Sequence, residues 1–189
     1  MYYNRKGGAW TMDKDIILVN TEDEPVGYGS KEEVHRKGLL HRAFSVFLYH
    51  GDKLLIQQRA EGKYHSAGLW ANTCCSHPRQ GETLEAAVKR RLLEEAGIVC
   101  ETKEIFSFVY RHVFHENLYE HEFDHVFLGA FQGDCRMNPE EVQAFRWIGL
   151  EELEEELRER PENYASWFKI AAPEVIRYLK NNLLRFCEK

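Results

Sequence analysis

The chain has 189 residues, of which 43% are hydrophobic and 30% are charged, and its formal net charge is −6. This length predicts one domain with a single sizeable core. The net negative charge argues against a general nucleic-acid or acidic-membrane surface. No apolar run approaches the roughly 18 residues that a membrane span needs. Any phosphorylated ligand would therefore be small and held by local basic residues.

The N-terminal residues 1–11 are polar and lack the apolar core of a signal peptide. We expect a tail there, with Met12 as an alternative start, followed by a single domain over residues 12–189. A reducing cytoplasm is the expected compartment, because the cysteines do not resemble a disulfide framework. They form an odd and scattered set: Cys74, Cys75, Cys100, Cys135 and Cys187.

The first half of the chain carries strand signals. Apolar and β-branched runs predict strands at 16–19, 44–49 and 54–56. His50-Gly51-Asp52 predicts a hairpin turn between the last two of these strands.

The pattern then changes to a helical period. Apolar residues recur at helical spacing from Thr83 to Ala96, and Gly97 lies where a helix would end. Beyond it we expect strands at 105–114, 120–131 and 145–148, an amphipathic helix at 150–157, and one or two helices within 165–186. The acidic run at 151–156 is interpreted as a solvated helix face.

A spaced pattern covers this predicted helix and the loop before it. In the form G-x5-E-x7-R-E-U-x-E-E-x-G-U, where U is bulky and apolar, the chain reads Ser76, Glu82, Arg90, Arg91, Leu92, Glu94, Glu95, Gly97 and Ile98. The segment resembles a Nudix box in which Ser76 replaces the first glycine and Arg91 replaces a carboxylate. Nudix hydrolases use carboxylates on this helix to hold cations that activate water, so Arg91 argues against water attack on a diphosphate.

Together with residues 72–78, the box resembles the type I isopentenyl-diphosphate isomerases. Other matching segments are 38–45, 119–124 and 167–170, so the resemblance spans roughly residues 15–170. It implies an α+β Nudix fold, in which helices flank a mixed β-sheet core as an α/β/α sandwich. It also implies conversion of isopentenyl diphosphate into dimethylallyl diphosphate through a tertiary carbocation, in isoprenoid precursor biosynthesis.

Allylic isomerisation needs an acid and a base across a dry pocket. The resemblance gives these roles to Cys75 and Glu122, with Tyr110 helping a proton to reach or leave Glu122. A cysteine alone is more simply explained as a small buried hydrophobe. Its position two residues before His77, ahead of the box, favours catalysis. Cys74 is expected to pack in the interior.

A metal site is expected beside the base. Glu120 and Glu122 are two residues apart, so a strand places both side chains on one face. The two carboxylates repel unless a cation lies between them or one is protonated, although an exposed charged edge is an alternative interpretation. The resemblance adds His35, His41 and His77, and implies one zinc or manganese ion held by the three histidines and two glutamates. The other histidines are expected at the surface or in packing: His50, His65, His112, His115, His121 and His125.

The resemblance also supplies a diphosphate site. Glu95 is assigned to a magnesium ion bound with the diphosphate. Trp167 is expected to stabilise the carbocation with its aromatic face, although core packing would also explain a tryptophan or Tyr110. Singly, each basic residue would be a solvated surface charge, but jointly they match substrate-binding positions: Lys31, Arg59, Lys63 and Arg91.

Two other functions are weighed against this one. A Nudix hydrolase would cleave a nucleoside or isoprenoid diphosphate, and Arg91 argues against it. A non-catalytic Nudix sensor would bind a phosphorylated ligand and regulate a partner, but it would not need the acid and base pair. We expect a monomer or dimer with a small diphosphate substrate, without nucleic-acid binding or membrane insertion.

Overall fold

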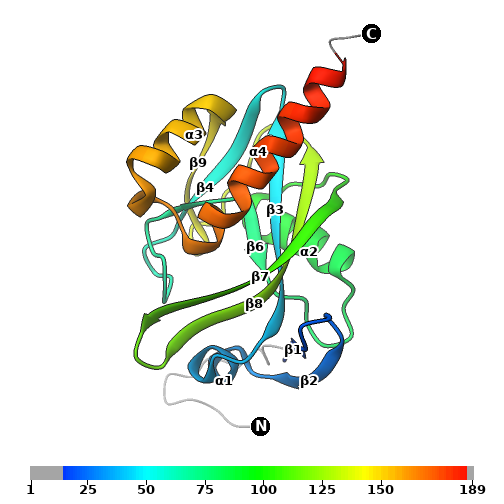
Figure 1. Ribbon diagram of the computed structural model, residues 1–189, viewed down its shortest axis with the longest axis vertical. Helices are drawn as coiled ribbons and strands as arrows, with labels where there is room; N and C mark the ends of the chain where they lie inside the picture. The colour runs from blue at the N-terminus through cyan, green and yellow to red at the C-terminus, as the bar shows by residue number, and fades with distance from the viewer. Residues whose placement is uncertain (1–14, 187–189) are drawn as a thin grey trace.

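The computed structural model describes residues 15–186, with side chains described up to residue 182, so the predicted tail at 1–11 lies outside the described residues. A nine-stranded sheet forms the centre of the molecule (Figure 1). The elements are β1 (Ile16–Val19), β2 (Pro25–Gly29), α1 (Lys31–Lys37), β3 (His41–His50), β4 (Lys53–Arg59), β5 (Trp70–Ala71), β6 (Cys74–Ser76), α2 (Leu84–Ala96), β7 (Lys103–His115), β8 (Leu118–Ala130), β9 (Val142–Gly149), α3 (Leu150–Glu159), a short 3-10 turn (Pro161–Asn163) and α4 (Ser166–Phe186).

The sheet is mixed, as expected. Strand β3 pairs in parallel with β8 along most of its length, and it pairs in antiparallel fashion with β1, β4 and β6. Strand β8 continues into a long hairpin with β7, and β9 joins the outer edge of β4. Because β3 lies between β6 and β8, side chains from chain segments far apart in sequence reach the same region.

Helices cover both faces of the sheet. In Figure 1, α4 crosses one face and α2 lies behind the other. Phe44 and Val46 pack with Val88 of α2 in one hydrophobic cluster. Phe47 points to the opposite face, where its ring stacks on Phe168 of α4 at 5.7 Å. Successive side chains of β3 therefore point to opposite faces of the sheet, and both faces are buried under helices. This confirms the expected α/β/α arrangement.

A gap opens in the sheet where β3 and β4 separate. Their pairing ends at Leu48 and Leu55, and Thr73 fills the place of the next rung. The Leu48 amide donates to the Thr73 hydroxyl at 3.0 Å, and that hydroxyl donates to the Leu55 carbonyl at 2.6 Å. The buried backbone groups are thus satisfied, and β6 can pair with β3 so that Cys75 lies opposite Ser45.

The box helix has the predicted bounds. Thr83 caps α2 by accepting a hydrogen bond from the Ala86 amide at 3.2 Å, and Gly97 ends the helix in the left-handed conformation. The region 165–186 forms one long helix that tolerates Pro173. Within residues 15–186, no helix is both long and apolar enough to cross a membrane.

Five short elements were not predicted from the sequence: α1, β2, β5, β6 and the 3-10 turn. Helix α1 has only seven residues and is highly charged, so it has no apolar period to detect. Strand β2 contains a proline and two glycines, and β5 and β6 have two and three residues. Pairing with the sheet, rather than local propensity, makes these segments regular.

Candidate active site

A cavity of about 300 Å³ lies beside the gap between β3 and β4. Its walls come from β3, β4, β6, β8, α2 and α4, and from the loop that contains Lys63. His35, His41 and Tyr110 lie behind the lining, in contact with lining residues. The predicted site residues that line the cavity are Lys31, Arg59, Lys63, Cys75, His77, Arg91, Glu95, Glu120, Glu122 and Trp167.

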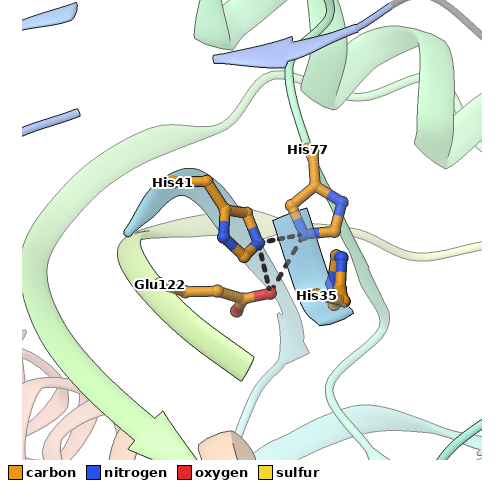
Figure 2. Close-up of side chains that lie close together, drawn as sticks. All are labelled: His35, His41, His77 and Glu122. Atoms are coloured by element: carbon orange, nitrogen blue, oxygen red, sulfur yellow. Dashed lines mark hydrogen bonds and ion pairs between the residues drawn. The ribbon is translucent and has the colours of Figure 1, made fainter. Parts of the chain in front are cut away.

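Three histidines and one glutamate converge at one end of this cavity (Figure 2). One nitrogen or oxygen from each of His35, His41, His77 and Glu122 lies within 4.8 Å of the others. Oε1 of Glu122 is 3.0 Å from Nε2 of His77 and 3.5 Å from Nε2 of His41. The strand register explains the pairing, because His41 of β3 and Glu122 of β8 are direct neighbours.

The hydrogen bonds of these imidazoles suit a divalent cation. Nδ1 of His35 donates to the Lys31 carbonyl at 2.7 Å, and Nδ1 of His41 donates to the Leu39 carbonyl at 2.8 Å. A carbonyl only accepts, so both Nε2 atoms are left with lone pairs. The buried Nε2 of His35 has no hydrogen-bond partner among the residues that the structure describes. A buried nitrogen facing two more imidazoles and a carboxylate belongs to a donor set that suits a divalent metal ion.

Burial keeps the imidazoles of His35 and His77 neutral. It lowers the pKa of His35 to about 4 and that of His77 to about 3. Burial alone would raise the pKa of Glu122, but the adjacent imidazoles of His41 and His77 outweigh it and hold that pKa well below its usual range. Neutral nitrogens and an ionised carboxylate are the forms that bind metals.

Glu120 lies next to this group of four without belonging to it. Tyr110 connects the two glutamates, since its hydroxyl is 2.6 Å from Oε2 of Glu122 and 3.0 Å from Oε2 of Glu120. Burial, followed by the charge of Glu122, raises the pKa of Glu120 well above its usual value. The negative charge of the pair is therefore concentrated on Glu122.

The two adjacent thiols face opposite sides of the sheet. Cys74 is fully buried against α2, as expected. Cys75 faces the cavity, and its sulfur is 3.7 Å from Nη1 of Arg59. Burial raises the pKa of Cys75 to about 12, so the neutral thiol, a proton donor, is the stable form.

Asn72 fixes Trp167 beside this thiol, a role that sequence reasoning missed. The indole N–H of Trp167 donates to Oδ1 of Asn72 at 2.9 Å. The Asn72 amide donates to the carbonyls of Cys74 at 2.5 Å and Val46 at 3.3 Å. One buried side chain thus joins α4, β6 and β3, and it sets the position of the indole that faces the cavity.

The other end of the cavity is cationic. Arg91 bonds Glu95 at 2.5 Å, one helical turn away as expected, and lies 3.1 Å from Glu141. Lys63 also forms an ion pair with Glu141. Burial, followed by the charges of Lys63 and Arg59, lowers the pKa of Lys31.

Comparisons with known proteins identify the family of the chain. A family model described as the NUDIX domain matches residues 39–168. Isopentenyl-diphosphate Delta-isomerase 2 of Aromatoleum aromaticum is 48% identical over 166 residues, covering 87% of this chain and 88% of that protein. The protein of the same name from Photorhabdus laumondii is 47% identical over 159 residues, covering 84% and 90%.

The chain belongs to the Nudix isopentenyl-diphosphate Delta-isomerases. Among solved structures, DR0079 from Deinococcus radiodurans is similar with a TM-score of 0.65 at 22% identity, covering 87% of this chain and 98% of that one. This likeness supports the Nudix fold.

For an isomerase of this family, His65 is the unexpected member of the cavity wall. We predicted a surface or packing role for it, but its Nε2 lies 3.2 Å from Oε1 of Glu120 and its side chain is only 6% exposed. The prediction was incomplete because this contact joins a loop to a distant strand, and no spacing along the chain relates the two residues. The other histidines of that group do not line the cavity.

Proposed function

We propose that this protein converts isopentenyl diphosphate into dimethylallyl diphosphate by moving protons at one end of the cavity while basic residues hold the diphosphate at the other. The observation that carries the proposal is the placement of Cys75 and Glu122 in one cavity. They come from β6 and β8, on either side of β3. This arrangement presents an acid and a base to a substrate lying between them.

The reaction adds one proton and removes another. One of Cys75 and Glu122 protonates the terminal methylene of the alkene, which leaves a tertiary carbocation. The other removes a proton from C2, and the double bond forms at its new position. Tyr110, 2.6 Å from Glu122, helps the proton to reach or leave that carboxylate. The face of Trp167 stabilises the cation without reacting with it.

The metal site would orient the base. We propose that His35, His41, His77 and Glu122 hold one zinc or manganese ion, with Glu120 as a further ligand. The ion, when bound, supplies a positive charge that sets the orientation and basicity of Glu122. Glu122 would then serve both as ligand and as proton-transfer group.

The diphosphate would bind at the cationic end. Its charge would be neutralised by four basic side chains: Lys31, Arg59, Lys63 and Arg91. Arg91 occupies a position that is a carboxylate in the general box, and here it would contact a phosphate. Glu95 would bind a magnesium ion that accompanies the diphosphate. The substrate would thus lie with its charged end against α2 and its alkene between the side chains of Cys75 and Glu122.

Substitution of the two reacting groups tests this proposal. We expect Cys75→Ala to lower turnover by at least about 10²-fold, the usual contribution of a positioned acid or base, while diphosphate binding is retained. Glu122→Gln should lower both turnover and bound metal. Cys74→Ala is the matched control, because its thiol faces α2, and it should stay active. Near-full activity of Cys75→Ala would refute the role of the thiol, and release of phosphate would favour a hydrolase.

A further inference from the structure

We propose that His65 is a positioning residue that orients Glu120, and through Glu120 the Tyr110 hydroxyl that contacts Glu122. The inference rests on the proposed function, because it concerns the same metal and proton-transfer site. It adds a side chain from the loop between β4 and β5 to the machinery contributed by the sheet.

The contact between His65 and Glu120 is buried and directional. Nε2 of His65 lies 3.2 Å from Oε1 of Glu120, and the two side chains are 6% and 4% exposed. Oε1 of Glu120 can accept a hydrogen bond even when a proton lies on Oε2, so Nε2 of His65 is the donor in this contact. Nδ1 lies 3.4 Å from the Ser66 hydroxyl, which can donate to it and stabilise that tautomer.

Glu120 is held at both of its oxygens. His65 bonds Oε1, while the Tyr110 hydroxyl lies 3.0 Å from Oε2 and 2.6 Å from Oε2 of Glu122. If Glu120 rotated, Tyr110 would lose this bridging position and the repulsion between the two carboxylates would change. Outer partners of this kind orient ligating carboxylates in metal sites.

The ring of His65 is itself fixed by its neighbours. It stacks on Phe114 with ring centroids 4.6 Å apart, and Trp167 meets its edge at 6.1 Å. Its backbone carbonyl accepts a hydrogen bond from Nη2 of Arg59 at 3.3 Å. A ring held in this way can direct its N–H at one oxygen of Glu120. We therefore expect the Nε2 donor, and not only the packing of the ring, to contribute to activity.

Two variants separate the nitrogen from the ring. His65→Phe keeps the aromatic packing and removes the donor, whereas His65→Gln keeps an N–H donor near the position of Nε2. We expect His65→Phe to lower kcat by about 10- to 100-fold, the range for outer partners of metal ligands, with KM within about twofold of wild type. His65→Gln should recover most of this loss. His112→Phe is the matched control, since His112 contacts the same Phe114 ring at 4.5 Å.

Metal affinity gives a second readout that needs no substrate. In competition with a chelator, His65→Phe should bind zinc about tenfold more weakly than wild type, and His65→Gln should bind it nearly as well. Unchanged kcat and zinc affinity in His65→Phe would show that His65 only packs in the interior. Equal losses in His65→Phe and His65→Gln would show the same. A wild-type protein that binds zinc without isomerase activity would refute the proposed function, and the chelator competition would still decide the role of His65.

The path through Tyr110 is tested by a double substitution. If His65 acts through Glu120 and Tyr110, His65→Phe should cost much less in a Tyr110→Phe background than in wild type, because the connection is already broken. Independent effects would instead multiply, and that result would overturn the proposed path.

Discussion

The groups in the cavity differ in protonation because burial opposes charge in Cys75, His77 and Glu122, but only Glu122 has two neighbouring imidazoles that offset the burial. Burial raises the pKa of Cys75 to about 12 and lowers that of His77 to about 3. Glu122 keeps its charge through His41 and His77. The cavity therefore contains a neutral thiol. A thiolate in its place would react with a carbocation and trap it.

The high pKa of Cys75 predicts slow alkylation of this thiol. The pKa of Cys75 in the folded protein, about 12, lies above the reference value of 9.0, so the native state resists deprotonation of this thiol. The contribution of the protonated thiol to the stability of the fold is therefore lost as pH rises from about 9 towards 12. The alkylation rate of Cys75 with iodoacetamide should keep rising through pH 10 without a plateau, as measured by mass spectrometry of its peptide. In urea the rate should level off near the reference pKa. A plateau near neutral pH in the native protein would contradict this assignment.

At the scale of elements, local signals located the box helix but not the short strand that carries Cys75. Thr83 and Gly97 mark the ends of α2 in the sequence as they do in the structure. Strand β6 depends instead on Thr73 bridging Leu48 and Leu55, which lie 25 and 18 residues away. No window along the chain contains that information.

Gly97 should be essential to the end of α2. Its φ is +65°, and an added Cβ would lie 2.9 Å from Cβ of Arg136. Gly97→Ala should therefore lower the free energy of unfolding by more than about 1 kcal/mol in urea denaturation, because the conformation and the space both disfavour a side chain. Gly62→Ala is the control, since no atom of the described residues lies within 4 Å of an added Cβ there. Equal stability of the two variants would contradict the argument.

At the scale of the whole molecule, the topology brings the metal ligands together. His77 is separated from His41 by 36 residues and from Glu122 by 45, yet strands flanking β3 bring all three into contact. The family resemblance predicted the histidines, whereas spacing alone does not. The position of His65 was predicted by neither, because its contact depends on how the loop before β5 folds over the sheet.

Metal binding should stabilise the fold. The buried Nε2 of His35 has no partner within the described part of the chain. A bound ion favours the native state by about 2.7 kcal/mol when its concentration is 100 times its dissociation constant. The melting temperature should rise when zinc or manganese is added to chelator-treated protein. His41→Phe should abolish that rise, and a wild-type melting temperature independent of metal would argue against the site.

The most direct test of the account is proton NMR of isopentenyl diphosphate incubated with the protein, magnesium and zinc or manganese in deuterated water. The account predicts that dimethylallyl diphosphate appears with solvent deuterium incorporated, and that Cys75→Ala abolishes it. Unchanged substrate with metal verified as bound, or product free of solvent deuterium, would contradict isomerisation by protonation and deprotonation.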